Sequence, residues 1–278
     1  MAKILNGKAL AKSIRAQVKS QIASMASPPG LAVIIVGDNP ASRVYVDNKK
    51  NDCKACGITS HEFALSSDIG EDKLLALVHE LNHRQDIHGI LVQLPLPEGY
   101  NVQKIIQAIS PKKDVDAFHM LNVGRVLNGE YGFLPCTPAG VIAMLDHYGI
   151  DAKGKHAVVV GHSNIVGKPM AMMLLNRDAT VTICHKHTVD LAVHTSQADI
   201  LVCAVGKIDL ITADMVKPGA VVIDVGINRK EDGTICGDVD FDAVSQIASH
   251  ITPVPGGVGP MTRALLMKNT AFAAELTI

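Results

Sequence analysis

The stretch VVVGHSNIVGKPMAMMLL, residues 158–175, reads as a buried strand, a glycine turn and a helix. Its spacing, G-x-S-x-x-x-G, differs from the common dinucleotide fingerprint. Gly161 permits a tight turn, and Gly167 permits close packing of the helix against the strand. Backbone N–H groups and the dipole at the start of this helix favour a phosphate. The stretch therefore predicts a nucleotide-binding half of a parallel α/β sheet.

On both sides of this stretch, apolar β-branched runs alternate with helical patterns. Such alternation predicts parallel strands with helical crossovers, and the long Val and Ile runs indicate a doubly wound sheet. Further strands are expected at 31–37, 58–64, 88–97, 179–185, 198–206 and 220–228. Helices are expected in the N-terminal segment and at 42–56, 71–83, 102–110, 141–149 and 263–276. Ser42 is the expected cap of the second helix, and Gly57 its stop. The loop-rich segment 110–140 is the expected domain junction.

The composition excludes several classes of protein. The 278 residues are 47% hydrophobic and carry a net charge of −1, so no electrostatic footprint for nucleic acid or an anionic membrane is expected. No apolar run approaches the roughly 20 residues of a membrane helix, and the amphipathic N-terminus lacks the apolar core of a signal peptide. These features predict a soluble cytoplasmic protein.

Two short patterns could indicate metal or redox chemistry. CKAC at 53–56 has metal-ligand spacing, but no second pair completes a zinc site, so reduced thiols are expected. HELNH at 79–83 matches the zinc-protease pattern. The helical period places His79 and His83 opposite the apolar face, towards solvent, and no third ligand is evident. We therefore expect no metal in the chemistry, with a zinc protease as the alternative.

The loop after the strand at 179–185 bears on cofactor choice. At this position a cofactor without a 2′-phosphate normally meets an acidic residue that binds its ribose. The segment HKHT, 185–188, offers His185, Lys186 and His187 instead. Cationic donors favour a 2′-phosphate, so NADP is predicted over NAD. A solvated basic loop is the alternative.

Other polar residues lie in loops or at strand ends, where ligand sites of α/β proteins occur. Tyr45 and Lys49 lie one helical turn apart, which makes either a binding face or an ordinary solvated surface. Gln93 follows a strand that two prolines close. The junction contains the segment KDVD with Asp116, and TPVPGGVGPMT at 252–262 forms a track of three prolines and three glycines. Each of these features also fits ordinary turn chemistry.

Taken in order, six segments resemble the bifunctional methylenetetrahydrofolate dehydrogenase/methenyltetrahydrofolate cyclohydrolase family, over essentially the whole chain. They are SxxYxxxK at 42–49, VQLPLP at 92–97, PKKDVD at 111–116, LPCTP at 134–138, VVVGHSNIVGKP at 158–169 and TPVPGGVGPMT at 252–262. The resemblance implies a folate-side α/β domain, 1–120 plus 260–278, to which the C-terminal helix returns. It also implies a Rossmann-like NADP domain at 121–259, folate in the cleft between the two domains, and a homodimer.

The resemblance further implies roles for individual residues. Lys49 would be the catalytic amine, Gln93 would hydrogen-bond and orient it, and Asp116 would bind the pterin. Tyr45 would stack on the aminobenzoyl portion of the folate. The remaining substrate-side residues are Ser42, Pro255, Gly256 and Gly257, and the cofactor-side residues are Gly161, His162, Ser163, Ile165, Lys186, His187, Gly206 and Ile227. His162 departs from relatives that carry Arg against the 2′-phosphate.

The implied activity is oxidation of 5,10-methylenetetrahydrofolate by NADP, followed by hydrolysis of the methenyl product to 10-formyltetrahydrofolate. Hydride transfer needs chiefly alignment of the reacting carbons. Hydrolysis needs a base, so the pKa of Lys49 must fall well below its usual value of about 10.4. Burial and the cationic methenyl group both act in that direction. The alternatives are a dehydrogenase with weak or absent cyclohydrolase activity and a non-catalytic nucleotide-binding module.

Overall fold

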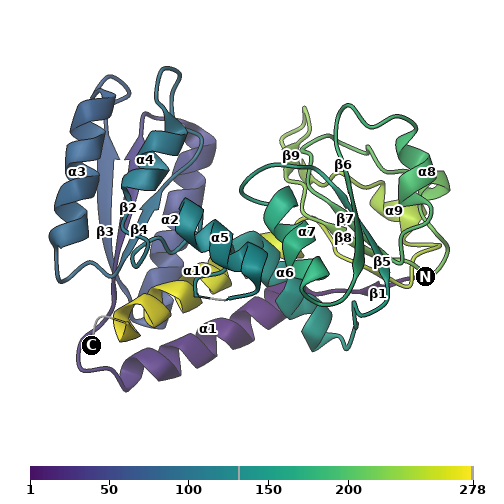
Figure 1. Cartoon of the computed structure of the whole chain (residues 1–278), viewed down its shortest axis with the longest axis horizontal. Helices are drawn as coiled ribbons and strands as arrows, with labels where there is room; N and C mark the ends of the chain where they lie inside the picture. The colour runs from purple at the N-terminus through teal and green to yellow at the C-terminus, as the bar shows by residue number, and fades with distance from the viewer. Residues whose placement is uncertain (131, 277–278) are drawn as a thin grey trace. The chain divides into compact units, whose positions relative to one another are not determined.

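The structure, a computed structural model, describes residues 1–130 and 132–276 and divides into two compact units, which we name by their sheets. The three-stranded unit contains Lys12–Arg125, residues 132–134 and the C-terminal segment from Arg263. The six-stranded unit contains Met1–Ala11, Val126–Glu130 and Pro135–Thr262. Both are parallel α/β assemblies (Figure 1), so the predicted fold class is confirmed.

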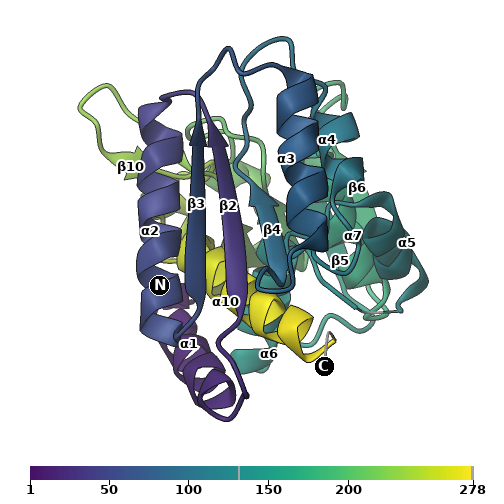
Figure 2. The same cartoon turned by 90° about the vertical axis from the view of Figure 1, so that its left-hand side faces the viewer.

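The sheet of the three-stranded unit has the order β3-β2-β4, and all its strands are parallel. Its strands are β2 (Gly30–Val36), β3 (Thr59–Leu65) and β4 (Gly89–Val92). The helices that lie mainly in this unit are α1 (Gly7–Ala23), α2 (Pro40–Cys56), α3 (Glu71–His83), α4 (Val102–Ala108), α5 (Met120–Asn128) and α10 (Val258–Glu275). Figures 1 and 2 show α3 and α4 on one side of the sheet and α2 on the other.

The central strand of this sheet is buried on both faces. All seven residues of β2 are buried, and alternate residues point to opposite faces of the sheet. One face packs Ile34 against the apolar stripe of α3 and against α4. The stripe of α3 is Leu74, Val78 and Leu81, whose spacing places them on one side of the helix. The periodicity seen in the sequence therefore sets how this helix packs.

The six-stranded unit has an all-parallel sheet of order β1-β11-β8-β7-β5-β6. Its strands are β1 (Lys3–Ile4), β5 (His156–Val160), β6 (Thr180–Cys184), β7 (Ile200–Cys203), β8 (Val221–Asp224) and β11 (His250–Ile251). A separate hairpin pairs β9 (Asn228–Arg229) with β10 (Ile235–Cys236). The helices are α6 (Cys136–His147), α7 (Gly167–Leu175), α8 (Leu191–Thr195) and α9 (Phe241–Val244), with a 3-10 turn at Ala213–Met215.

The C-terminal helix packs on the three-stranded unit, as predicted. The Asn269 side chain donates to the backbone oxygens of Val115 (2.8 Å) and Leu134 (2.9 Å). Arg263 pairs with Asp52 of α2 at 3.1 Å. These contacts attach the part of the helix from Arg263 onward to this unit. Within the described residues, no helix is long and apolar enough to cross a membrane.

Two expectations about elements were wrong. The segment 110–140 was expected to be loop-rich, but it contains α5, and the helix expected from 141 already begins at Cys136 as α6. The start of α5 depends on a buried carboxylate, since Asp114 accepts hydrogen bonds from the backbone of Phe118 and His119. The cap of α2 is also different. The Asn39 side chain accepts from the backbone N–H of Ser42 at 3.1 Å, so Asn39 caps the helix and Ser42 lies in its first turn.

Candidate functional site

A lysine and a glutamine meet where β4 ends. The Lys49 amine donates to the side-chain oxygen of Gln93 at 2.9 Å, and the Gln93 amide nitrogen donates to the backbone oxygen of Leu94 at 2.6 Å. Both side chains are half-buried. The second hydrogen bond fixes which way the amide faces, so its oxygen is presented to the amine. The hydrogen bond predicted between these residues is therefore present.

The position of Gln93 follows from the sheet. Its backbone N–H donates to the oxygen of Ile34 at 2.8 Å, which extends the β-ladder one residue beyond β4. Pro95 and Pro97 then lack the N–H groups needed to continue pairing. The side chain is held at the carboxyl end of a parallel sheet, where ligands of open α/β folds bind.

Helix α2 brings an aromatic ring near the same lysine. Tyr45 precedes Lys49 by one helical turn, which places the two on one side of the helix. The Tyr45 side chain is 38% exposed, so a ring face is available to a ligand. Ser42, one turn earlier, is only 4% exposed and lies in the packed first turn of the helix. The surface of α2 that a ligand can reach is therefore at Tyr45 rather than at Ser42.

A buried carboxylate holds the loop that carries Asp116. The Asp114 side chain accepts from the backbone of Phe118 (3.2 Å) and His119 (2.8 Å) and from the Asn122 amide (2.8 Å). Burial raises the pKa of Asp114 above its ordinary value, and these donors act in the opposite direction. Asp116 itself is half-buried. The segment KDVD contains two acidic residues, Asp114 and Asp116. The hydrogen bonds that hold this loop are made by Asp114.

The glycine turn after β5 has the geometry that the sequence predicts. Gly161 has a positive φ of 124°, and a β-carbon there would collide with the backbone oxygen of Ala204. A β-carbon on Gly167 would collide with the backbone of Gly161, so the helix start lies directly against the turn. The Ser163 hydroxyl accepts from the backbone N–H groups of Val166 (3.2 Å) and Gly167 (3.3 Å). Ser163 is exposed and Ile165 is half-buried beside it.

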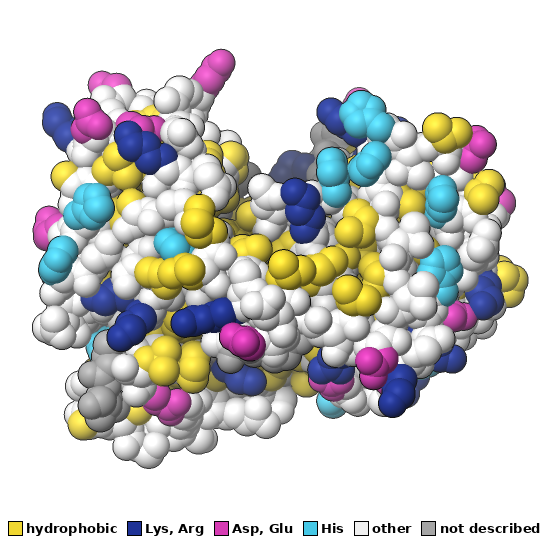
Figure 3. Space-filling view, viewed as in Figure 1, with side chains coloured by type: hydrophobic (Ala, Val, Ile, Leu, Met, Phe, Trp, Pro, Cys, Tyr) yellow, Lys and Arg dark blue, Asp and Glu magenta, His cyan; other side chains and the backbone are white. Residues whose placement is uncertain are grey.

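The loop after β6 gathers imidazoles with Lys186. The ring centroids of His162 and His185 are 4.9 Å apart, and those of His185 and His187 are 6.0 Å apart. Figure 3 shows histidine side chains gathered on the face of this unit near the end of β6. Lys186 and His187 are exposed, and none of the ion pairs found in the described residues involves this group. The site can therefore meet an anion with several donors.

A carboxylate that the sequence analysis did not single out organises two further loops. Asp238 accepts from the backbone N–H groups of Val205 (2.7 Å), Gly206 (3.1 Å) and Lys207 (2.9 Å). It also accepts from the Asn228 side chain at 2.9 Å, next to Ile227, which is 47% exposed. The loops with the predicted residues Gly206 and Ile227 thus share one buried anchor. In the sequence, Asp238 lies in GDVD at 237–240. This pattern is common in acidic turns, so it did not indicate an anchoring role.

A second buried carboxylate lies beside this anchor. Asp224, at the end of β8, accepts from the backbone N–H groups of Gly226 (2.9 Å), Asp238 (3.0 Å) and Val239 (3.0 Å). Burial raises the pKa of Asp224 to about 6, against the lowering effect of these donors. Because Asp224 is buried, water cannot easily replace these hydrogen bonds, and the end of β8 therefore depends on them.

The glycine track is tied to the N-terminus of the chain. Lys8 donates its backbone N–H to the oxygen of Gly256 at 2.9 Å, and a β-carbon on Gly7 would collide with Gly257. Gly257 donates to the backbone oxygen of Pro253 at 2.8 Å, Gly256 has a positive φ of 114°, and Pro255 is exposed. The track is a closely packed turn at the end of β11, and its glycines are required by that packing.

The cysteine and histidine patterns have structural explanations. Cys53 and Cys56 are buried free thiols, and burial raises their pKa values to about 12 and about 11, so both stay protonated. His79 and His83 are exposed, as predicted from the helical period. In the part of the chain that the structure describes, no three His, Cys, Asp or Glu side chains are grouped to hold a metal ion.

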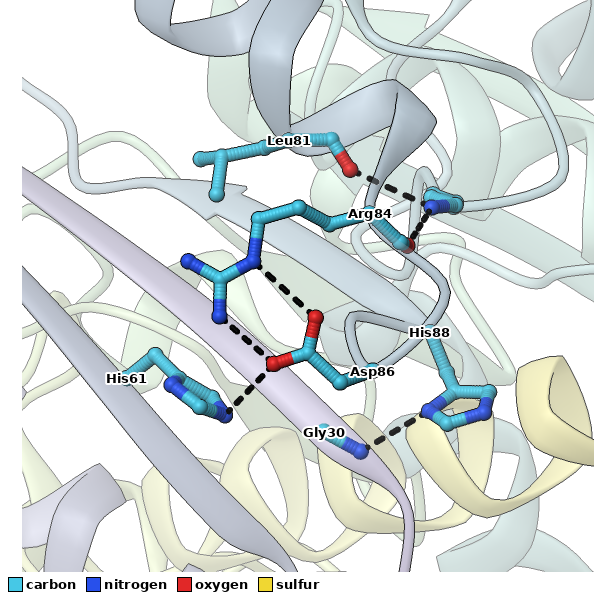
Figure 4. Close-up of polar contacts among 7 residues, drawn as sticks. Gly30, His61, Leu81, Arg84, Asp86 and His88 are labelled. Atoms are coloured by element: carbon cyan, nitrogen blue, oxygen red, sulfur yellow. Dashed lines mark hydrogen bonds and ion pairs between the residues drawn. The ribbon is translucent and has the colours of Figure 1, made fainter.

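A separate polar group lies where α3 ends and β4 begins (Figure 4). The Lys113 amine donates to the backbone oxygens of Leu81 (3.2 Å) and Arg84 (2.7 Å), which closes the end of the helix. His88 accepts from the backbone N–H of Gly30 through Nδ1 at 2.9 Å. Burial, followed by the charge of Lys113, lowers the pKa of His88. These contacts stabilise the amino-terminal edge of the sheet, away from Gln93 at its carboxyl end.

The six-stranded unit fits a dinucleotide. The glycines at 161 and 167 let the turn lie directly against the start of α7. The Ser163 hydroxyl and backbone oxygen accept from the first backbone N–H groups of that helix, which holds the turn. The donors at His162, His185 and Lys186 lie after adjacent strands of one sheet. The dipole of α7 favours a phosphate near the start of this helix, and the donors after β5 and β6 favour a second anionic group at the end of β6.

Comparisons with known proteins give one consistent result. Residues 5–116 match the family model for the catalytic domain of tetrahydrofolate dehydrogenase/cyclohydrolase, and residues 135–278 match its NAD(P)-binding domain. A bifunctional protein FolD from Paracidovorax citrulli is 56% identical over 277 residues, covering 99% of this chain and 98% of the relative.

Two solved structures agree with this match. The bifunctional enzyme FolD, a methylenetetrahydrofolate dehydrogenase/cyclohydrolase from Campylobacter jejuni, has a TM-score of 0.98 at 51% identity and covers 100% of both chains. The Trypanosoma brucei enzyme, complexed with NADP cofactor and an inhibitor, has a TM-score of 0.95 at 36% identity, with 99% of this chain and 98% of that chain covered.

Proposed function

The chain belongs to the tetrahydrofolate dehydrogenase/cyclohydrolase family, and from this premise we propose a bifunctional, NADP-dependent enzyme. It oxidises 5,10-methylenetetrahydrofolate to the 5,10-methenyl compound and hydrolyses that product to 10-formyltetrahydrofolate. Support comes from the bifunctional relatives, which align over nearly the whole chain, and from the two groups of polar residues described above.

The observation that carries the hydrolytic half is the hydrogen bond between Lys49 and Gln93. A neutral amide oxygen accepts from an ammonium group and also from a neutral amine. Gln93 can therefore keep Lys49 in place before and after the lysine takes up a proton. A carboxylate in the same position would favour the charged form and weaken the base.

In the hydrolytic step, a water oxygen adds to the carbon that joins N5 and N10 of the methenyl cation. Lys49, in its neutral form, takes one proton from that water as the C–O bond forms. The bond from this carbon to N5 then breaks, the electron pair goes to N5, and the formyl group remains on N10. As the formyl C=O forms, the remaining hydroxyl proton is lost; one of the two water protons ends on N5 and the other, through Lys49, on solvent. The step therefore consumes one water and releases one proton.

The oxidative half is assigned to the cofactor residues of the six-stranded unit. When bound, NADP supplies the acceptor for the hydride. Gly161, Ser163 and the start of α7 would hold the pyrophosphate, while Lys186 and the imidazoles would meet the 2′-phosphate. The loop with Gly206 and Ile227, anchored by Asp238, would border the nicotinamide end. The NADP complex of the Trypanosoma brucei enzyme supports the same cofactor here.

We assign the folate ring systems to residues of the three-stranded unit, and the substrate-side role of the glycine track stays a prediction. Tyr45 would stack on the aminobenzoyl ring, and Asp116 would accept hydrogen bonds from the polar edge of the pterin. Ser42, which is buried, would contribute through the first turn of α2. Pro255, Gly256 and Gly257 would present backbone groups on the cofactor side.

A dehydrogenase without cyclohydrolase activity is the alternative within the family. The bifunctional relatives do not favour this alternative. It also leaves the oriented amine of Lys49 unexplained, because hydride transfer does not need a base at that position. A zinc protease is contradicted by the family match and by the exposure of His79 and His83. We further propose that the protein is cytoplasmic and forms a homodimer. Sedimentation of the purified protein would test the dimer.

The experiment for the proposed function is direct. Purified protein is mixed with methylenetetrahydrofolate and either NADP or NAD, and absorbance is followed at the reduced-cofactor and methenyl bands. We expect reduction of NADP with transient methenyl compound that decays into 10-formyltetrahydrofolate. Failure to reduce either cofactor would overturn the proposal, and a methenyl product that decays only at the uncatalysed rate would support the alternative dehydrogenase.

A further inference from the structure

A buried asparagine on the C-terminal helix contacts the loop that carries Asp116. Asn269 lies within α10 and is 8% exposed. Its amide nitrogen donates to the backbone oxygens of Val115 (2.8 Å) and Leu134 (2.9 Å). An amide nitrogen carries two protons, so these two acceptors use both of them. The side chain therefore joins α10 to two loops that lie 154 and 135 residues earlier in the chain, all within the three-stranded unit.

The helix itself does not explain an asparagine at this position. Asparagine favours caps and turns over helix interiors, because its side chain competes for backbone hydrogen bonds. Leu266 and Ala273 lie one turn before and one turn after Asn269 on the same side of α10, and both are apolar and 1% exposed. An apolar side chain at 269 would therefore suit both the helix and its packing. The amide is explained by the two oxygens to which it donates.

The contact with Val115 acts directly on the residue that follows it. The oxygen that accepts from Asn269 belongs to the peptide group that joins Val115 to Asp116. A peptide group is planar, so a contact that holds its oxygen also sets the orientation of the bond that leads to the α-carbon of Asp116. The direction in which the Asp116 side chain leaves the backbone follows from that orientation.

The backbone on the other side of Asp116 is held as well. The Asp114 side chain accepts from the backbone N–H groups of Phe118 (3.2 Å) and His119 (2.8 Å), and its backbone oxygen accepts from Ala117 at 3.1 Å. Ala117 has a positive φ of 59°, which a residue with a β-carbon rarely adopts unless its surroundings hold it. Asp116 thus lies between a contact from α10 before it and the contacts of Asp114 after it.

We propose that Asn269 is a positioning residue for the folate site and that it acts through Asp116, by holding the peptide group before it. The inference rests on the proposed function, in which the Asp116 carboxylate accepts hydrogen bonds from the pterin. Hydrogen bonds depend steeply on distance and angle, and a displacement of about 1 Å in a positioned group can cost about a hundredfold in rate. The effect of Asn269 reaches the ligand only through the carboxylate.

A double-mutant cycle on the full-length protein tests this inference. Asn269→Leu keeps the branched shape of the side chain and removes both donors, and Asp116→Ala removes the carboxylate that is to be positioned. Methylenetetrahydrofolate is titrated calorimetrically into the unmutated protein, both single variants and the double variant, without NADP so that it is not oxidised. We expect Asn269→Leu to weaken folate binding by about tenfold, which corresponds to one charge-assisted hydrogen bond. In the Asp116→Ala background the same change should weaken binding by less than about twofold, because the two residues act as a unit.

Two further measurements separate positioning from general stability. Asn82→Leu, in α3, is the matched control, since the Asn82 amide also holds two backbone groups of this unit: it donates to Ala108 at 2.7 Å and accepts from Ser110 at 2.8 Å. Both leucine variants should lower the urea midpoint of unfolding, but only Asn269→Leu should weaken folate binding. The affinity for NADP alone should stay unchanged in both. Asn269→Asp, which also removes both donors, is made in parallel so that the test does not depend on one variant folding.

The outcomes separate this inference from the proposed function. Equal losses of folate affinity with and without the Asp116 carboxylate would show that Asn269 does not act through it, and unchanged affinity in the Asn269 variants would likewise overturn the inference. A loss of the same size in Asn82→Leu would assign the effect to general destabilisation. In each of these cases the unmutated protein still turns over its substrates. An unmutated protein that does not bind methylenetetrahydrofolate would overturn the proposed function itself.

Discussion

The amine of Lys49 lies 2.9 Å from the side-chain oxygen of Gln93, and the amide of Gln93 is itself held by the backbone oxygen of Leu94. The contact joins the middle of α2 to the end of β4 within the three-stranded unit. It holds an amine with a neutral partner, which is the arrangement that a lysine base requires. Two of the predictions below concern this contact.

The first prediction changes the charge of the partner. Gln93→Glu keeps the length of the side chain but places a carboxylate next to Lys49, which stabilises the ammonium form. Cyclohydrolase activity should fall by about tenfold or more, while NADP-dependent oxidation changes little. The matched control is Gln85→Glu, an exposed glutamine beyond α3. A Glu variant with unchanged hydrolysis would show that the lysine does not act as a base.

The second prediction tests the anionic end of the cofactor. Lys186→Asp replaces an exposed cation by an anion beside the proposed 2′-phosphate subsite. The KM for NADP should rise by about tenfold to a hundredfold, and that for NAD should change little, since repulsion acts only on the phosphate. Lys153→Asp, at the amino-terminal end of the same sheet, is the control. Parallel losses with both cofactors would contradict the assignment.

The third prediction concerns the anchor beneath the cofactor loops. Asp238→Asn leaves one acceptor oxygen for donors from Val205, Gly206, Lys207 and Asn228. Lost charge-assisted hydrogen bonds should lower the unfolding free energy by about 1–3 kcal/mol and weaken cofactor binding by about tenfold. Cofactor titration and urea unfolding measure the two effects. Binding that stays at the unmutated level would show that the loops do not need this carboxylate.

Some features of the fold were accessible from the sequence, because they depend on local patterns. The helix α3 was expected at 71–83 and is found with those bounds, since its apolar stripe and its flanking residues are all local. The strand expected at 31–37 is found at Gly30–Val36, because long β-branched runs are typical of buried parallel strands. The strand expected at 220–228 begins at Val221 but ends four residues early, at Asp224. Gly57 ends α2 with a positive φ of 85°, as its position indicated.

Other features depend on contacts between segments that are far apart in the sequence, so local sequence patterns could not predict them. The strand β1 has only two residues, and it forms because it pairs with β11 near the other end of the chain. The start of α5 depends on the carboxylate of Asp114, and the cofactor loops depend on Asp238. In each case a buried acid accepts backbone hydrogen bonds from a segment that sequence periodicity does not connect with it. The partnership of Lys49 and Gln93 was expected only through the family resemblance.

The fourth prediction concerns acid stability and His88. Burial lowers the pKa of His88 in the folded protein, and its Nδ1 accepts from Gly30, so folding favours the neutral ring. The unfolded chain therefore takes up the proton first as the pH falls below about 6.5. The stabilisation by His88 is present above that pH and is lost as the pH falls through the folded pKa.

A variant isolates this contribution. His88→Gln retains an acceptor for Gly30 but does not titrate, so its unfolding free energy should fall less between pH 7.5 and pH 5.5. Urea unfolding at the two pH values measures the difference, and the exposed His83→Gln serves as the control. An identical pH dependence in the His88 variant and in the unmutated protein would contradict this explanation.

The most direct measurement for the account as a whole is the methenyl absorbance in Lys49→Met. Methionine keeps the approximate volume of the lysine stem and removes the amine that Gln93 holds. Loss of a general base typically costs about 10²–10⁴ in rate. The variant, with Lys50→Met as its exposed neighbouring control, is mixed with methylenetetrahydrofolate and NADP where uncatalysed hydrolysis is slow. We predict that NADP is still reduced and that methenyltetrahydrofolate accumulates. Hydrolysis at the unmutated rate would show that Lys49 only binds the substrate and would contradict the proposed mechanism.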